Sequence, residues 1–167
     1  DFLLRVQPNI LVSQLLNFYG TNAAGIGTLY AAYYWVYTPL QIPAGLIVDR
    51  YSTRLVLTLS ALLCALGALL FAKVNLYTVA LFARILMGFG SAFAFIGALK
   101  LAALWLPQRY FAAFSGLATT LGTVGALITN VILPIWITDL GWQQAVLITG
   151  YIGLGIALLI AIIVRNK

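Results

Sequence analysis

The chain has 167 residues and is strongly apolar: 63% of its residues are hydrophobic, 7% are charged, and its mean hydropathy is +1.07. This composition excludes an ordinary water-soluble domain and places the chain in a lipid bilayer. The net charge of +6 comes from basic residues that are too scattered to follow a phosphate backbone, so nucleic acid is excluded as a partner.

Six apolar stretches follow one another along the chain, and each approaches or exceeds the length that a helix needs to cross the hydrocarbon core. They cover residues 1–19, 25–48, 55–71, 77–105, 111–137 and 144–164. Lipid offers the backbone no hydrogen-bond partner, which favours helices, and residues 152–164 lack the alternation of a membrane barrel. The predicted fold class is all-α, a polytopic membrane protein with six transmembrane helices.

The first stretch carries a charge at the depth of the hydrocarbon zone. Arg5 lies about 15 residues, and so about 22 Å, before the polar break that follows Tyr19. A charge at this depth predicts a substrate-binding role, with a snorkelling side chain as the alternative. Asn9 is expected to add an amide contact. With neither an initiator Met nor a charged leader before it, the first helix is expected to be truncated at its start.

Asp1 stands four residues before Arg5, a spacing that lets an acid and a base meet on one helix face. Burial would favour the neutral acid and Arg5 the carboxylate, so Asp1 is interpreted as a proton-coupling group. The alternative, which the sequence favours equally, is that Asp1 is a solvated residue at the start of the helix.

The second stretch carries a polar stripe. Tyr30, Tyr34, Tyr37 and Gln41 recur at helical spacing and are expected to share one face. Phenol and amide groups on one face favour a cavity wall that binds a small polar metabolite, and anchoring at the membrane interface is the alternative.

A charged segment joins the second and third stretches and contains Gly45, Asp49, Arg50 and Arg54. We expect it to act as a cytoplasmic gate, in which Asp49 accepts hydrogen bonds from Arg50, Arg54 or Arg109. The basic residues of the loops also set the orientation, because all of them except Lys73 fall on one side of the predicted bundle. Both chain ends are therefore predicted to be cytoplasmic.

The fourth stretch contains a second deep charge. Arg84 lies about 8 residues below the outer end and so about 10 Å shallower than Arg5, and the two are not expected to act on the same ligand group. Arg84 is predicted to be either a substrate ligand or a hydrogen-bond donor between helices, and Lys100 to snorkel. Glycines of the fourth and fifth stretches are expected to allow close helix packing; they are Gly88, Gly90, Gly116, Gly122 and Gly125.

Two segments resemble signatures of the major facilitator superfamily. Residues 45–54 are similar to its loop pattern Gly-x-Leu-Ala-Asp-Arg-x-Gly-Arg-Arg/Lys, with Ser52 where Gly is usual, and residues 84–92 are similar to the Arg-x-x-x-Gly-x-Gly pattern of its fourth helix. The resemblance implies that residues 1–167 form an amino-terminal helical bundle, built as two inverted three-helix repeats. This is half of a twelve-helix fold whose carboxy-terminal half is absent here.

Residues 5–9, 41–45 and 88–93 resemble the bacterial branches that import amino acids or nucleosides, and the first-helix Arg resembles that of organic-anion symporters. The implied function is secondary active transport in a bacterial inner membrane: proton-coupled uptake of a small charged or zwitterionic metabolite, an amino acid or organic anion, by alternating access. The implied partner is the missing half or a second copy of the chain. The alternatives are a drug/proton antiporter and a non-transporting receptor or assembly subunit.

An enzyme is not predicted. The chain has no His and only three widely spaced acids, so it offers no Ser–His dyad, no His-based metal site and no carboxylate pair. No cofactor is expected.

Overall fold

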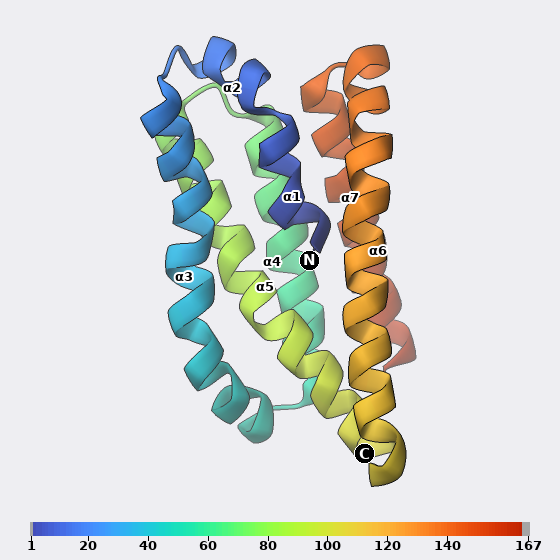
Figure 1. Ribbon diagram of the computed structural model, residues 1–167. Helices are drawn as coiled ribbons and strands as arrows, with labels where there is room; N and C mark the ends of the chain where they lie inside the picture. Colours follow the sequence, from blue (N-terminus) through green and yellow to red (C-terminus); the bar gives the residue numbers. More distant parts are fainter. Residues whose placement is uncertain (1, 165–167) are drawn as a thin grey trace.

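The structure, a computed structural model, describes residues 2–164, and every regular element among them is a helix (Figure 1). In chain order the helices are α1 (Phe2–Ile10), α2 (Val12–Tyr19), α3 (Ala23–Arg50), α4 (Thr53–Lys73), α5 (Tyr77–Trp105), α6 (Gln108–Leu140) and α7 (Trp142–Ile163). The prediction of an all-α fold is confirmed. Asp1, Arg165 and Lys167 lie outside the described residues.

The first predicted helix is in fact two. The chain bends at Leu11, whose backbone angles of φ −96° and ψ 6° lie outside the helical region, and α2 begins at the next residue. Gly20 then ends α2 in the left-handed conformation, with φ at 58°, which is accessible to a residue without a Cβ. Apolar periodicity continues across the bend, and the sequence pattern alone therefore indicates one helix.

Side-chain caps fix the ends of the next two helices. Asn22 accepts a hydrogen bond from the Gly25 amide at 2.9 Å and begins α3, and Ser52 accepts one from the Leu55 amide at 3.3 Å and begins α4. The charged segment between α3 and α4 is thus reduced to Tyr51 and Ser52, and most of its charges lie in the last and first turns of the two helices.

The helices pack around α4 and α5. α4 lies between α5 and α7, α3 packs along α5, and α1 packs along α6. Glycines let the backbone of α5 touch its neighbours: a Cβ on Gly88 would come within 2.3 Å of the Tyr33 carbonyl oxygen on α3, and one on Gly90 within 2.6 Å of the Ser60 carbonyl oxygen on α4. The predicted close packing is confirmed there. It is not found at Gly116 or Gly125 of α6, which have open space beside them.

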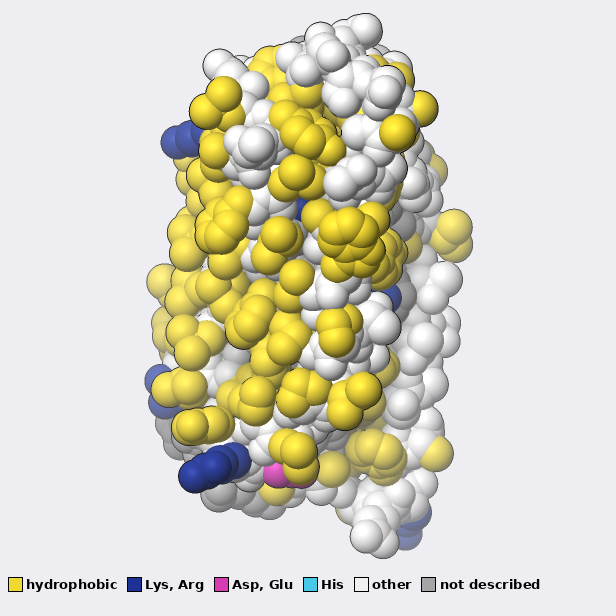
Figure 2. Space-filling model, turned by 90° about the vertical axis from the view of Figure 1, so that its left-hand side faces the viewer, with side chains coloured by type: hydrophobic (Ala, Val, Ile, Leu, Met, Phe, Trp, Pro, Cys, Tyr) yellow, Lys and Arg dark blue, Asp and Glu magenta, His cyan; other side chains and the backbone are white. Residues whose placement is uncertain are grey.

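Four of the described helices, α4 to α7, are long and apolar enough to cross a membrane. α3 has 28 residues, but its Tyr, Thr and Gln side chains lower its hydropathy. Arg50, Arg54 and Arg109 lie at one end of the bundle, called here the basic end, and Lys73 lies at the other. Between the ends, the face seen in Figure 2 is mainly apolar. This is the surface that a bilayer accommodates.

Candidate functional site

Two arginines and two tyrosines stack into a row in the interior of the bundle, called here the Arg–Tyr ladder. The guanidinium carbon of Arg84 lies 4.9 Å from the centre of the Tyr33 ring. Tyr33 stacks on Tyr37 with ring centres 5.7 Å apart and an interplanar angle of 17°. The guanidinium carbon of Arg5 lies 4.3 Å from the centre of the Tyr37 ring, and Arg5 also donates a hydrogen bond to the Tyr37 hydroxyl. Three helices thus meet through these four side chains.

Local helix geometry positions the ladder. Tyr33 and Tyr37 are one turn apart on α3, so their rings lie one above the other. α1 supplies Arg5 and α5 supplies Arg84, one turn before the glycine at which α5 and α3 touch. Each guanidinium faces an aromatic ring, an arrangement that favours a cation in a site with little water.

Arg84 fastens α1 and α3 to α5. It is 1% exposed, and it donates from Nη1 to the Leu4 carbonyl oxygen at 3.0 Å and from Nε to the Leu29 carbonyl oxygen at 3.4 Å. The Leu4 carbonyl is open to this bond because the residue four positions later is Pro8, which has no amide hydrogen. Of the two roles predicted for Arg84, the structure therefore shows the bond between helices. Its Nη2 is buried and has no hydrogen-bond partner among the described residues.

The two arginines, expected at different depths, are connected through the ladder. Arg84 reaches the carbonyl of the residue that directly precedes Arg5, and two stacked rings join the guanidinium groups. An estimate from helical rise places Cα atoms only; it omits the long arginine side chains, which extend along the bundle.

The predicted tyrosine stripe divides between two environments. Tyr37 belongs to the ladder, while Tyr30 is half-buried and its enclosed hydroxyl has no hydrogen-bond partner in the described part of the chain. Tyr34 is 42% exposed, with its ring 6.3 Å from that of Tyr37. Gln41 is exposed on the same helix, and Asn9 is exposed on α1. The structure thus places Tyr30 and Tyr37 inward and leaves the other members of the set at the surface.

At the basic end, Lys100 is the partner of Asp49. The Lys100 ammonium lies 3.1 Å from a carboxylate oxygen of Asp49 and also donates a hydrogen bond to the Val48 carbonyl oxygen. Lys100 was expected to snorkel, and the structure shows where its ammonium lies: it joins the end of α3 to α5. Arg109, expected as a donor to Asp49, instead stacks on the ring of its neighbour Tyr110 at 4.7 Å.

The remaining gate residues lie at the surface of the basic end. Arg50 and Arg54 are exposed, on either side of the turn between α3 and α4. Gly45 is half-buried, and a Cβ on it would meet no atom within 4 Å. In this conformation the glycine is not required by close packing inside the bundle.

The sequence analysis missed Tyr33, the pairing of Lys100 with Asp49 and a buried contact between α1 and α7. In that contact Gln7, 1% exposed, donates to the Thr149 hydroxyl at 3.4 Å. The spacing of Tyr33 and Tyr37 was visible in the sequence, as was the position of Pro8 four residues after Leu4. Lys100 and Asp49 are 51 positions apart, and no local pattern joins them.

The ladder is positively charged. The two acids in the described part of the chain, Asp49 and Asp139, lie near helix ends rather than beside the rings. Within the described residues no group of three His, Cys, Asp or Glu side chains could hold a metal ion. The chemistry that the ladder offers is therefore donation of charged hydrogen bonds to an anion.

Comparison with known proteins gives the family. A family model described as "Major Facilitator Superfamily" matches residues 5–167. The chain belongs to the major facilitator superfamily. Both superfamily segments quoted from the sequence lie inside the matched range, so the predicted family is confirmed.

Three curated relatives in the superfamily match most of this chain. "Probable sulfoacetate transporter SauU" of Cupriavidus necator is 23% identical over 168 residues, 99% of this chain and 39% of the relative. "Uncharacterized transporter YybO" of Bacillus subtilis is 32% identical over 160 residues, 91% of this chain and 35% of the relative. "Probable galactarate/D-glucarate transporter GudP" of Escherichia coli is 29% identical over 164 residues, 92% of this chain and 35% of the relative. The chain thus spans 35–39% of the length of these relatives.

Superfamily membership and the four membrane-length helices indicate an integral membrane protein of the transporter type. Within it, the ladder lies on α1, α3 and α5, and the Lys100–Asp49 pair lies at the basic end of α3 and α5. The two features share α3 and α5 and are well separated along them.

Proposed function

We propose that this superfamily member carries a small organic anion across the membrane as a secondary transporter, and that the Arg–Tyr ladder binds the anion. One observation carries the proposal: the buried Nη2 of Arg84 and the enclosed hydroxyl of Tyr30 have no hydrogen-bond partner among the described residues. Buried donors without partners are destabilising, and oxygens of a ligand would satisfy them.

A carboxylate or sulfonate is the ligand chemistry that fits. A guanidinium binds such groups through charged hydrogen bonds, and each phenol ring of the ladder keeps a cation in place when the anion leaves. The names of two relatives support this class, since sulfoacetate, galactarate and D-glucarate are all anions. The positive ladder disfavours a lipophilic cation, and with it the drug antiporter.

Alternating access would use the two features in turn. Anion binding at Arg84 would compete with the bonds that fasten α1 and α3 to α5, and so would change how these helices pack. At the basic end, the Lys100–Asp49 pair would hold α3 against α5 in one conformation and separate in another. Gly45, Arg50, Arg54 and Arg109 would surround this gate, and Tyr34, Gln41 and Asn9 would line the path to it.

The membrane, the orientation and the partner of the bundle also belong to this proposal. The bundle would be the amino-terminal half of a transporter in a bacterial inner membrane, with its basic end cytoplasmic and a carboxy-terminal half or a second copy as partner. Proton coupling through Asp1 remains part of this proposal.

The test is ligand-induced stabilisation of the full-length gene product. Sulfoacetate, D-glucarate, an amino acid, a nucleoside and a lipophilic cation are each added during thermal unfolding. A ligand at about 100 times its Kd stabilises the folded state by about 2.7 kcal/mol. We expect an organic anion to do so, and Tyr30→Phe, which removes one hydroxyl, to reduce the effect. The matched control is Tyr110→Phe, at an exposed position of the basic end.

Three results would contradict the proposal. Stabilisation by lipophilic cations alone would favour the drug antiporter. Stabilisation by an anion that Tyr30→Phe and Tyr110→Phe reduce equally would place the anion away from the Tyr30 hydroxyl, against the observation that carries the proposal. Binding without uptake into proteoliposomes would favour a receptor.

A further inference from the structure

Gln7 of α1 is a buried amide that the proposed function does not use. It is 1% exposed, and its Nε2 donates to the Thr149 hydroxyl of α7 at 3.4 Å. The direction of this bond is fixed, because the Thr149 hydroxyl donates its own hydrogen to the Val146 carbonyl oxygen at 2.7 Å. A hydroxyl has a single hydrogen to donate, so Thr149 accepts from the amide. Position 7 therefore needs a side chain that donates.

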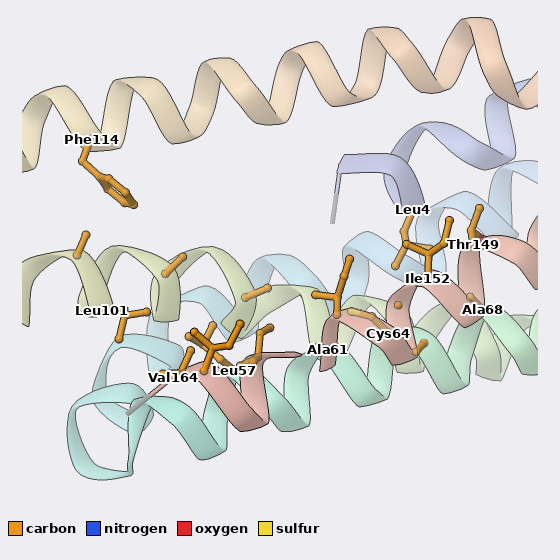
Figure 3. Close-up of a pocket in the computed structure, with 18 of the residues that line it drawn as sticks. Leu4, Leu57, Ala61, Cys64, Ala68, Leu101, Phe114, Thr149, Ile152 and Val164 are labelled. Carbon is orange, nitrogen blue, oxygen red and sulfur yellow. The ribbon is translucent and has the colours of Figure 1, made fainter. Parts of the chain in front are cut away.

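The surroundings of Thr149 are apolar. This residue lies in the wall of a cavity of about 810 Å³ between α4, α5, α6 and α7, and Leu4 of α1 lies at the same end of that cavity (Figure 3). Of the described residues that line the cavity, Thr149 alone carries a hydroxyl, and most of the others are aliphatic. An amide without a partner is costly in such surroundings. The bond from Gln7 therefore favours one position of α1 against α7.

The Gln7 bond and the Arg5 contact leave α1 on nearly opposite sides. Successive residues of a helix are about 100° apart, so side chains two positions apart are separated by about 200° around the axis. Arg5 reaches Tyr37 on α3, while Gln7 reaches Thr149 on α7. Polar contacts from a single turn thus hold α1 between α3 and α7.

The rotation of α1 about its own axis couples these two contacts. Apolar packing between helices, such as that of α1 along α6, has no preferred direction, whereas a hydrogen bond has one. A guanidinium about 6 Å from the axis moves by about 1 Å when the helix rotates by about 10°. A hydrogen bond stretched by about 1 Å is no longer made. A change at Gln7 is therefore expected to reach Arg5 on the other side of the helix.

We propose that Gln7 is a positioning residue of the Arg–Tyr ladder: its bond to Thr149 fixes the rotation of α1 and so holds the Arg5 guanidinium against Tyr37. For anion binding this rests on the proposed function, in which the ladder is the binding site. Gln7 is not an anion ligand in this role, because its amide donates toward α7. The competing explanation is a bond that stabilises the bundle without regard to Arg5.

A double-mutant cycle in the full-length gene product separates these two roles without any ligand. Gln7→Met and Thr149→Val each remove the bond with little change in side-chain volume. Tyr37→Phe reports on the Arg5 contact. We expect Tyr37→Phe to lower the midpoint of thermal unfolding in the wild type, and to lower it by less than half as much in either background. Thr149→Ser keeps the hydroxyl and is expected to keep the full effect of Tyr37→Phe.

Anion affinity provides the second readout. With sulfoacetate or D-glucarate as the probe, we expect Gln7→Met to raise the Kd about three- to twentyfold, the range given by hydrogen bonds between membrane helices. In a Tyr37→Phe background the same change is expected to have less than about a twofold effect. The matched control is Gln14→Met, because Gln14 lies on α2, beyond the bend, and accepts from the neighbouring Ser13 at 2.9 Å.

Three results would overturn the proposal. The first is an equal effect of Tyr37→Phe in the wild type and in both bond-deleting backgrounds, and the second is no effect of Tyr37→Phe in the wild type. The third is a Kd that Gln7→Met and Gln14→Met change equally. If one bond-deleting variant does not fold, the other completes the cycle. If neither anion stabilises the wild type, the proposed function fails, and the unfolding cycle alone decides the role of Gln7.

Discussion

The backbone contact between α3 and α5 at Gly88 permits a quantitative test by adding one methyl group. In Gly88→Ala the new Cβ would lie 2.3 Å from the Tyr33 carbonyl oxygen, whereas ordinary contact begins at 3.4 Å. The two helices must therefore separate by about 1.1 Å, because the contacted atom is backbone and cannot rotate away. Overpacking of this kind costs about 1–3 kcal/mol.

The control is the same substitution where space is open. A Cβ on Gly116 of α6 meets nothing within 4 Å, and alanine in a helix is favoured over glycine by about 0.5–1 kcal/mol. Gly116→Ala is therefore expected to leave the midpoint of thermal unfolding unchanged or to raise it. For a chain of this size about 1 kcal/mol shifts the midpoint by about 2–4 °C, so Gly88→Ala is expected to lower it by about 2–12 °C.

The assay is thermal unfolding of the purified variants in detergent, followed with a thiol-reactive dye. Cys64 is the single cysteine of the chain and packs at the α4–α5 contact, where its thiol lies 3.4 Å from the Ser91 hydroxyl, so it reacts when these helices separate. Equal midpoints for Gly88→Ala and Gly116→Ala would refute the backbone contact between α3 and α5, and with it the geometry that holds Tyr33 in the ladder.

Three further predictions concern the ladder and the gate. Tyr37→Phe keeps the ring beside Arg5 but removes the hydroxyl, so the free energy of unfolding is expected to fall by about 0.5–1.5 kcal/mol. Tyr34→Phe, at an exposed position, is expected to leave it unchanged. Equal effects would argue against the hydrogen bond from Arg5 to the Tyr37 hydroxyl. Lys100→Met is expected to change the free energy of unfolding by less than about 1 kcal/mol, since Asp49 is 75% exposed, yet to speed tryptic cleavage at the turn after α3. An unchanged cleavage rate would argue against a Lys100–Asp49 pair that holds α3 to α5. Asp49→Asn is expected to slow uptake and to leave ligand-induced stabilisation intact. Loss of both would show that the gate and the binding site are not separate.

The membrane fold and the family could be predicted from the sequence because both depend on features that are local along the chain. Apolar runs of sufficient length predicted the helices, and the charged segment around Asp49 carried the family pattern. The bend at Leu11 could not be predicted, because the apolar pattern continues through it. Helix ends were predicted to within a few residues where Asn22 and Ser52 provide caps.

The candidate site was predicted in part. Arg5, Tyr37 and Arg84 were singled out because charged and phenolic groups at membrane depth require a reason. Their connection through Tyr33 could not be predicted, because it depends on how α1, α3 and α5 approach one another. The same limit applies to Lys100, whose partner is fixed by the packing of α5 on α3.

Pro8 has an effect that reaches beyond its own helix. Because it lacks an amide hydrogen, the Leu4 carbonyl oxygen is left for Arg84, and the position of a cation on α5 is thus encoded in the sequence of α1. Replacing Pro8 with Ala would introduce a rival donor for that oxygen and loosen the guanidinium without touching it. A proline is usually regarded as a site of bending, but here the hydrogen that it lacks leaves a carbonyl acceptor free for a donor from a second helix.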